Sequence, residues 1–321
     1  MNLEQALEHA NNMLAPQLLF DQPDQNALWA ERERNEEAIV VLRDAWMSQP
    51  SPSFSFDLVR HLADHNRQVC DGLDEKRLRK LSPKTLTRSL SDGDIVRSIA
   101  ALQGRSVEDV RAETQGQPDN FGIAYVSHPV KGTVVGIDIE TTGIDPARSH
   151  IINCGWEFTE LAKRAKPHDA FAVFFGLPDV YEERGVPLEN IHHITWDMVA
   201  SESQLRNNEK AQHALVTMLE TYPYVAHNAA FEDSWFMLHL DGYAEARKEG
   251  RITPIDSRDI CRRIDPDART LPRESKPATL ENWARRRGTL KAGEKERHLG
   301  LEDVDLMLAT MQAEFKERNM Y

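Results

Sequence analysis

The stretch Gly132–Gly143, GTVVGIDIETTG, is the most informative segment of this chain for predicting its fold. It joins a short β-branched apolar run, typical of a buried strand, to two carboxylates near its end, Asp138 and Glu140. Because side chains alternate along a strand, these acids share one face, with Cα atoms about 6.5 Å apart. Two unpaired carboxylates on a buried strand are costly in desolvation and mutual repulsion. A divalent cation is the simplest partner that relieves this cost.

The composition of the chain favours two domains over one large domain. The chain has 321 residues, of which 40% are hydrophobic and 28% are charged. The net charge of −13 divides almost evenly between residues 1–130 and 131–321, so neither part carries a broad basic surface for nucleic acid. A carboxylate-held metal supplies its own positive charge, so net charge alone does not exclude a nucleic-acid substrate.

The cysteines and the N-terminus predict a soluble, cytoplasmic protein. Cys70, Cys154 and Cys261 are far apart and odd in number, which argues against a disulfide framework or a zinc site. The N-terminus lacks the basic and apolar regions of a signal peptide. No apolar run approaches the roughly 18 residues that a membrane span requires, so no membrane contact is expected.

Residues 1–125 predict a separate all-helical domain of unknown role, because apolar residues recur at a helical period through most of it. Residues 114–131 lose this period and are rich in turn residues, so they predict a linker before a second domain at 126–321. Within the first domain, residues 92–112 read as two helices around Gly104. This spacing also occurs in DNA-binding helix-turn-helix units, but the acidic second helix favours an ordinary helical hairpin.

Beyond the linker, apolar alternation and helical periods predict an α/β sheet of mixed direction. The expected strands are 133–139, 151–159, 170–176 and 223–227, and the expected helices are near 209–221, 229–240, 278–287 and 300–317.

A second informative segment, Tyr224–Phe236, reads YVAHNAAFEDSWF, a short strand that runs into a helix with two acids. Phe231, Trp235 and Leu238 form one apolar stripe on this helix. Glu232 lies about 90° from that stripe, whereas Asp233 lies nearly opposite, so Glu232 is the better placed acid if the stripe faces the sheet. The alternative is an acid pair that only complements the helix dipole.

A third segment, His298–Asp303, reads HLGLED at the start of the last helix. The helical period leaves Asp303 and Asp305 on the two flanks of the apolar stripe and does not choose between them. His298 approaches Asp303 only if it lies in the loop before the helix, which Gly300 permits. The spacing of a histidine five residues before an acid selects nothing by itself, because it occurs three times, as His192/Asp197, His227/Glu232 and His298/Asp303.

The motifs DIETTG, HNAAFE and HLGLED, in this order, resemble those of the DEDDh-type 3′–5′ exonucleases, which include the polymerase proofreading epsilon subunits. NIHHIT at Asn190–Thr195, Asp256 and the segment TLENWARRRG also fall where the family has related features. The resemblance covers about residues 131–318. It implies a ribonuclease H-like fold with a mixed five-stranded sheet flanked by helices, and nothing in residues 1–125 matches it.

The resemblance also implies residue roles. Asp138, Glu140, Asp303 and Glu232 would hold two divalent metal ions, Mg²⁺ or Mn²⁺, and His298 would take the proton from the attacking water. Two such cations, about 4 Å apart and held by oxygen ligands, suit phosphodiester hydrolysis, and a histidine suits the role of base. The residues expected to bind the terminal nucleotide are Thr141, Thr142, Asn228 and Phe231.

The expected function is a two-metal-dependent 3′–5′ exonuclease that releases nucleoside monophosphates from single-stranded DNA or RNA 3′ ends, with a role in DNA repair. A protein partner for residues 1–125 is left open. The family usually has aspartate where this chain has Glu232, whose side chain is one methylene longer. The alternative is therefore a catalytically impaired nucleic-acid or protein binding module. A two-carboxylate glycosidase explains neither His298 nor the ordered motifs.

Basic residues gather in the last third of the chain. Their plain interpretation is solvated helix faces, and the alternative is a track for a phosphate backbone, which would make activity depend steeply on salt. These residues are Arg262, Arg263, Arg269, Arg273, Arg285, Arg286, Arg287, Lys291, Lys295 and Arg297.

Overall fold

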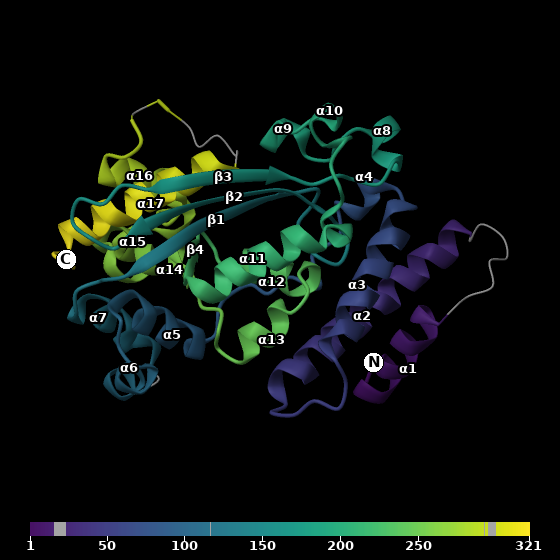
Figure 1. Ribbon diagram of the computed structural model, residues 1–321, viewed down its shortest axis with the longest axis horizontal. Coiled ribbons are helices and arrows are strands. Elements are labelled where there is room, and N and C mark those ends of the chain that lie inside the picture. The colour runs from purple at the N-terminus through teal and green to yellow at the C-terminus, as the bar shows by residue number, and fades with distance from the viewer. Residues whose placement is uncertain (16–23, 116, 292, 295–299) are drawn as a thin grey trace.

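The computed structural model describes residues 1–15, 24–115, 117–291, 293–294 and 300–321, and its centre is a five-stranded sheet (Figure 1). The strands have the order β3-β2-β1-β4-β5. β2 runs antiparallel to β1 and β3, whereas β4 and β5 run parallel to β1. This is the ribonuclease H-like mixed sheet expected from the sequence. The strands are β1 (Thr133–Thr141), β2 (Ile151–Glu160), β3 (His168–Phe174), β4 (Tyr224–Ala226) and β5 (Pro254–Asp256).

Four of the five strands lie where apolar alternation places them, with ends that differ by at most two residues. β5 does not stand out in the sequence because its three residues are too few to show a period. Its pairing with β4 defines it instead, since Val225 lies opposite Ile255.

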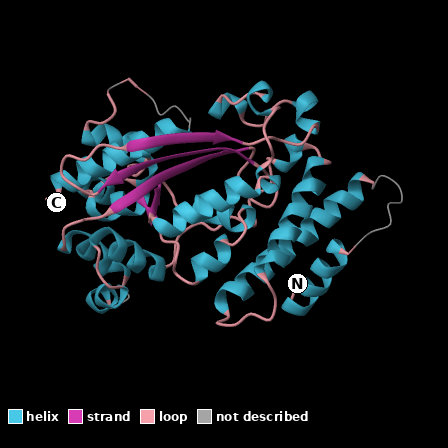
Figure 2. Ribbon diagram, in the orientation of Figure 1, coloured by secondary structure: helices cyan, strands magenta, loops and turns pink. Residues whose placement is uncertain are grey.

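Helices cover both faces of the sheet (Figure 2). Val135, Ile137 and Ile139 of β1 point into a core shared with α11 (Glu209–Thr221) and α12 (Ala230–His239). Val134, on the alternate face, packs with α17 (Gly300–Glu317), α16 (Leu280–Arg287) and α14 (Ser257–Ile264). The alternation of β1 therefore divides the core into two layers.

Two glycines let α17 lie close against the sheet. A Cβ atom on Gly136 would lie 2.8 Å from Val304 Cγ1, and one on Gly155 would lie 2.5 Å from the Leu301 nitrogen. Any larger residue at these positions would push the helix away. This close approach holds the first turn of α17 over the neighbouring strands β1 and β2.

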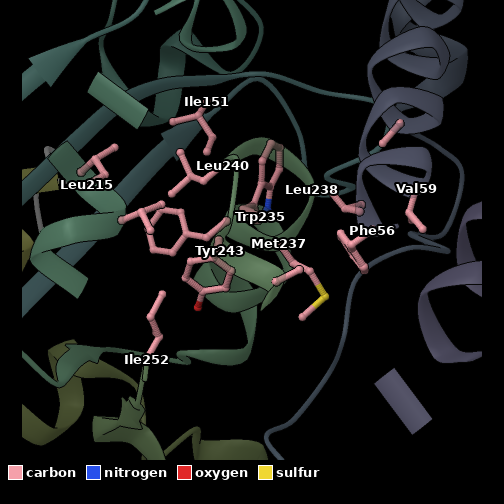
Figure 3. Close-up of a cluster of buried hydrophobic side chains, with 14 of the residues drawn as sticks. Phe56, Val59, Ile151, Leu215, Trp235, Met237, Leu238, Leu240, Tyr243 and Ile252 are labelled. Carbon is pink, nitrogen blue, oxygen red and sulfur yellow. The ribbon is translucent and has the colours of Figure 1, made fainter. Parts of the chain in front are cut away.

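The first helices of the chain pack beside the sheet layers rather than on them (Figure 1). α3 carries Phe56 and Val59, which lie against Met237 and Leu238 of α12 in a buried apolar cluster (Figure 3). The helices of this group are α1 (Leu3–Leu14), α2 (Gln25–Ser48), α3 (Phe56–Asp71) and α4 (Glu75–Leu78).

A second group of helices packs near β5 and α14. α5 (Asp92–Gln103) and α6 (Val107–Thr114) form the expected helical hairpin, with Gly104 in the left-handed conformation at φ 56°. Ser98 of α5 donates a hydrogen bond of 2.7 Å to the Pro254 carbonyl at the start of β5. The hairpin is therefore anchored to the sheet, while the division into domains at residue 125 stays a prediction.

The expected linker at 114–131 is wrong in one respect, because it contains helix α7 (Pro118–Ser127). Pro118 begins this helix, and Phe121, Ala124 and Tyr125 are buried. A Cβ on Gly122 would lie 3.0 Å from the Arg263 carbonyl oxygen, so α7 lies close against α14. Tertiary packing overrides the turn-rich composition here.

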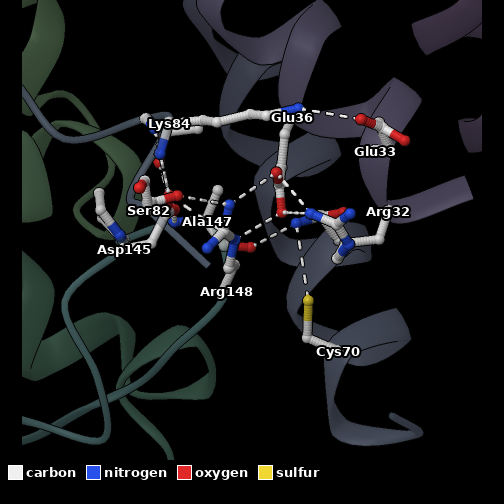
Figure 4. Close-up of polar contacts among 12 residues, drawn as sticks. Arg32, Glu33, Glu36, Cys70, Ser82, Lys84, Asp145, Ala147 and Arg148 are labelled. Atoms are coloured by element: carbon white, nitrogen blue, oxygen red, sulfur yellow. Dashed lines mark hydrogen bonds and ion pairs between the residues drawn. The ribbon is translucent and has the colours of Figure 1, made fainter. Parts of the chain in front are cut away.

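A buried ion network ties α2 to the loop that follows β1 (Figure 4). Glu36 accepts hydrogen bonds of 2.8 Å from Arg32 and of 2.6 and 2.9 Å from Arg148. Asp145 of the same loop accepts hydrogen bonds of 2.7 Å from the backbone nitrogen of Lys84 and of 2.5 Å from the Thr85 hydroxyl. The loop is thereby fixed by residues from the first part of the chain.

The remaining helices are short or lie in connections. None of the described helices is long and apolar enough to span a bilayer, and the three cysteines are buried free thiols. These helices are α8 (Val180–Arg184), α9 (Glu189–His192), α10 (Trp196–Val199), α13 (Tyr243–Lys248), α15 (Pro266–Thr270), η1 (Leu205–Asn207) and η2 (Arg273–Ser275).

Candidate active site

Three carboxylates converge at the end of β1, and we call them the acid cluster. Oxygen atoms of Asp138, Glu140 and Asp303 all lie within 4.8 Å of one another. Asp138 and Glu140 come from the face of β1 that α17 covers, and Asp303 comes from the first turn of α17. The close approach at Gly136 and Gly155 brings the helix and strand carboxylates together.

The structure distinguishes the two acids that flank the apolar stripe of α17. Asp303 is 8% exposed and belongs to the acid cluster. Asp305 is exposed, and its charge adds to the effect of burial in raising the pKa of Glu157 on β2. Of these two acids of α17, Asp303 is therefore the one that shares the site with the acids of β1.

The two adjacent acids of α12 also have different surroundings, although both are buried. Asp233 accepts hydrogen bonds of 2.7 Å from the Tyr243 hydroxyl and 2.9 Å from Arg247 Nε, so its charge is compensated. Among the described residues nothing donates a hydrogen bond to Glu232 Oε2. Glu232 is thus the acid of this pair that has an oxygen available for a ligand.

Burial raises the pKa of Glu232 well above its usual range, and the nearby carboxylates of Asp256, Asp233 and Glu140 raise it further. Burial likewise raises the pKa of the Cys154 thiol, with added contributions from Asp138 and Glu232. These effects place Glu232 within the electrostatic reach of the β1 acids. The site concentrates negative charge that a bound cation would relieve.

Asn228 and Phe231 lie where β4 passes into α12. Asn228 has a positive φ of 92°, which is strained for a residue other than glycine, and its nitrogen donates 3.0 Å to Asp256 Oδ1. The Phe231 nitrogen donates 2.7 Å to the Asn228 carbonyl, and its half-buried ring lies 5.7 Å from the Trp235 ring. The end of β5 therefore fixes the turn that carries both residues.

Thr141 and Thr142 follow the acids of β1, and both are buried. The Thr141 hydroxyl donates 2.6 Å to the Gly143 carbonyl, while the Thr142 hydroxyl accepts 2.9 Å from the His150 nitrogen. Both hydroxyls thus shape the loop itself. A cavity of about 140 Å³ adjoins Thr142 and Gly143, lined partly by residues 70–81 of the first part of the chain.

His298, the expected base, lies outside the described residues, and so do Lys295 and Arg297. The other two histidines with the same spacing to an acid have local structural roles. His227 lies within hydrogen-bonding distance of the Ser257 hydroxyl, at 2.9 Å, and of the Ala278 carbonyl, at 3.0 Å. His192 bonds within its own loop, at 2.8 Å to the Pro187 carbonyl and 3.0 Å to the Ile194 nitrogen.

Arg258 is a neighbour of the site that the sequence pattern does not single out. Its Nη1 lies 3.5 Å from the Asn228 Oδ1 atom, and its backbone nitrogen donates 2.9 Å to Asp256. The signal is weak in the sequence because the arginine cluster becomes dense only from Arg262 onward. Pairing of β5 with β4 brings Arg258 next to Asn228.

The sequence matches no protein-family model, and no curated protein matches it. Among solved structures, the chain is similar to E. coli ExoI in the zinc-bound form of its complex with single-stranded DNA, at 18% identity and a TM-score of 0.44. The match covers 58% of this chain and 41% of the ExoI chain. A likeness this distant carries no weight in assigning a function, which rests on the geometry of the site.

Proposed function

We propose that the protein is a metal-dependent 3′–5′ exonuclease of the DEDDh type that releases nucleoside monophosphates from single-stranded DNA or RNA. The observation that carries this proposal is the convergence of Asp138, Glu140 and Asp303 within 4.8 Å. Three carboxylates at this separation repel one another strongly unless cations lie between them. We further propose that residues 126–321 form the catalytic domain and residues 1–125 a helical domain.

The donor set fits two hard divalent cations, Mg²⁺ or Mn²⁺, because every candidate ligand is an oxygen. Asp138, Glu140 and Asp303 would hold them, together with Glu232, whose buried Oε2 lacks a hydrogen-bond partner among the described residues. When bound, such ions lower the pKa of a water molecule and offset charge on a leaving oxygen.

In the proposed reaction, a water oxygen attacks the phosphorus of the terminal phosphodiester. The bond from phosphorus to the O3′ atom of the preceding nucleotide breaks, which frees a nucleoside 5′-monophosphate. His298 takes the proton of the water, since a histidine is half-protonated near neutral pH. The leaving O3′ takes a proton from solvent and becomes the new 3′ hydroxyl.

The terminal nucleotide would lie between the loop after β1 and the start of α12. Thr141, Thr142 and Asn228 provide backbone and amide groups there, and the half-buried Phe231 ring offers an apolar surface for a base. The strained backbone of Asn228 supports a binding role, because such strain is commonly retained where a ligand is held.

The direct test follows nucleotide release from a 3′-labelled oligonucleotide with Mg²⁺ or Mn²⁺. The wild-type protein should release labelled nucleotides, and Asp138→Ala should lose this activity while keeping its thermal unfolding temperature. Matched single- and double-stranded DNA and RNA substrates would then establish preference. A wild-type protein that releases no nucleotides from any of them would show that the enzyme proposal is wrong.

Glu232 motivates a second candidate, a binding module with impaired chemistry. Its side chain is one methylene longer than the aspartate expected in the family, and it is only 3% exposed. Under this alternative the wild-type protein binds the labelled strand without cleaving it, and Glu232→Asp restores cleavage. Mn²⁺ binding measured calorimetrically on both proteins separates a lost metal site from a misplaced one.

A further inference from the structure

The segment that follows β5 forms a groove of about 750 Å³, which we call the basic groove. Residues 258–279, from α14, α15, η2 and the loop before α16, line it. Among the described lining residues there are five cations and no carboxylate: Arg258, Arg262, Arg269, Arg273 and Lys276. Such a concentration is notable in a chain whose net charge is −13.

The cations of the basic groove differ from the other arginines of this region in their pairing. In the part of the chain that the structure describes, none of the five forms a salt bridge, and all except Arg258 are exposed. Several arginines of the same region are held by carboxylates instead: Arg263 by Asp259, Arg285 by Glu281, and Arg286 and Arg287 by Asp265. The groove therefore gathers cations that form no salt bridge with the described residues.

Arg258 and Arg262 stand one helical turn apart on α14, where like charges repel. Partial burial lowers the pKa of Arg258, and the charge of Arg262 lowers it further. The Arg258 Nε atom is buried without a hydrogen-bond partner among the described residues. An anion in the groove would relieve this repulsion.

Arg258, which lines the basic groove, also borders the candidate active site. Arg258 contacts Asn228 at 3.5 Å, and Asn228 begins the turn that leads to Glu232. Asp256 also bonds to the backbone nitrogens of both Asn228 and Arg258. A strand whose last nucleotide lies at Asn228 would thus meet Arg258 next and the exposed cations after it.

We propose that the basic groove binds phosphates of the substrate strand upstream of its 3′ end, so that the enzyme prefers polynucleotides over dinucleotides. This inference rests on the proposed exonuclease function. A planar guanidinium group can donate two parallel hydrogen bonds to the oxygens of one phosphate. Keeping exposed arginines free for a ligand costs the protein little stability. An acidic peptide offers similar charge, but nothing would require it to continue into the metal site.

The test compares Arg269→Glu/Arg273→Glu with a control, Arg34→Glu/Arg111→Glu, which makes the same change in net charge at exposed residues of α2 and α6. Release of 3′ nucleotides is measured for a single-stranded 12-mer and for a dinucleotide. We expect the groove variant to raise KM for the 12-mer by about 10-fold or more, with kcat unchanged. The dinucleotide should be cleaved equally by wild type, control and variant.

Salt dependence gives a second readout. If two phosphate contacts are lost, the slope of log kcat/KM against log salt concentration should become shallower by about 1.4 for a single strand. The milder Arg269→Gln/Arg273→Gln variant should show the same trend, and thermal unfolding establishes that both variants fold. A groove variant that matches the control on the 12-mer, or that loses dinucleotide cleavage equally, overturns the proposal.

Failure of the proposed function would be recognised separately, because the wild type would then release nothing from either substrate. Binding of a fluorescent 12-mer without metal still tests the groove in that case. Weaker binding by the groove variant than by the control supports it, and equal binding overturns it. A poly-glutamate peptide that binds more tightly than the 12-mer also overturns it.

Discussion

The loop that follows β1 and the segment that follows β5 both begin at the C-terminal ends of their strands. These ends lie on the same side of the sheet, because β1 and β5 both run parallel to β4. In the first, Arg148 is buried against Glu36, which also holds Arg32. In the second, Arg262 and Arg269 are exposed and lack salt bridges among the described residues. The same residue type is thus buried and paired in one segment, and exposed without a salt bridge to any described residue in the other.

This contrast gives a criterion for distinguishing charges that stabilise the fold from charges that are free to bind a ligand. A buried arginine needs carboxylates around it, so removing the arginine or its carboxylate lowers the free energy of unfolding. An exposed arginine without a partner adds little to stability, so it can be kept free for a ligand at little cost to the fold. The same rule separates the neighbours Asp233, which is paired with Arg247, and Glu232, whose Oε2 atom accepts no hydrogen bond from the described residues.

The largest expected effect is on stability and concerns Glu36. Glu36→Ala leaves Arg32 and Arg148 buried without their shared carboxylate, so the free energy of unfolding should fall by about 3–5 kcal/mol. Urea denaturation measures this change. Glu33→Ala, on the same helix, removes only an exposed pair with Lys84 and should cost less than about 1 kcal/mol. Equal stability of the two variants would contradict the expectation that buried, paired charges contribute more to stability than exposed ones.

The next effect separates the adjacent acids of α12. Asp233→Asn should lower the free energy of unfolding by about 2 kcal/mol, because Arg247 loses one of its two carboxylates and keeps Asp94. Glu232→Gln should leave the metal-free protein as stable as wild type or more so, since it replaces a buried carboxyl group whose ionisation is opposed by burial and by the nearby carboxylates. Its nucleotide release should nevertheless fall by roughly 10–100-fold or more. The reverse pattern, stability lost at Glu232 and activity lost at Asp233, would exchange their roles.

A smaller effect is expected when one cation of the basic groove is removed. Arg262→Ala should change the free energy of unfolding by no more than about 0.5 kcal/mol, because its guanidinium is exposed. The salt slope of 12-mer binding should become shallower by about 0.7. Arg34→Ala serves as the control and should change neither quantity. A clear loss of stability in Arg262→Ala would place this arginine with the structural group instead.

The smallest expected effect concerns the pKa of His227, which lies within hydrogen-bonding distance of the carbonyl of Ala278 in the basic groove. Burial lowers the pKa of His227 to about 4, and the charges of Arg258 and Arg262 contribute to the lowering. Because the unfolded chain takes up a proton between pH 6.5 and about 4 that the folded chain does not, stability falls as the pH is lowered through this range.

Arg258→Gln removes one of these charges and should raise the pKa of His227 slightly, as measured by an NMR titration. The resonance is assigned by its loss in His227→Gln. If the pKa of His227 stays unchanged in Arg258→Gln, the charge of Arg258 is already compensated by an anionic partner. That result would contradict the assignment of Arg258 to the arginines without a salt bridge among the described residues.

Much of the fold could be predicted because periods in the sequence report on burial. The β1 strand follows from GTVVGIDIETTG, and α17 follows from the spacing of Leu301, Val304 and Leu308. β5 could not be found this way, because three residues carry no period. The turn-forming residues of α7 do not predict a helix. Its helical conformation is stabilised by packing on α14, which the sequence pattern does not report.

The candidate site was predictable only in part. Asp138 and Glu140 share a face because strand geometry demands it, so their pairing needs no tertiary information. Asp303 and Asp305 are equivalent in the helical pattern, and only the close contact of α17 with Gly136 separates them. The preference for Glu232 over Asp233 came from the helical wheel, and their roles in catalysis stay a prediction.

The order of residues along the chain predicts which of them can act as metal ligands or as a base and which segments form strands, because residue chemistry and periodicity are local properties. Which charges are compensated depends instead on the three-dimensional fold. Pairing depends on groups far apart in sequence, such as Glu36 with Arg148 and Asp233 with Arg247. The free energy of a charge depends on the partners and the water around it, and the fold alone sets both.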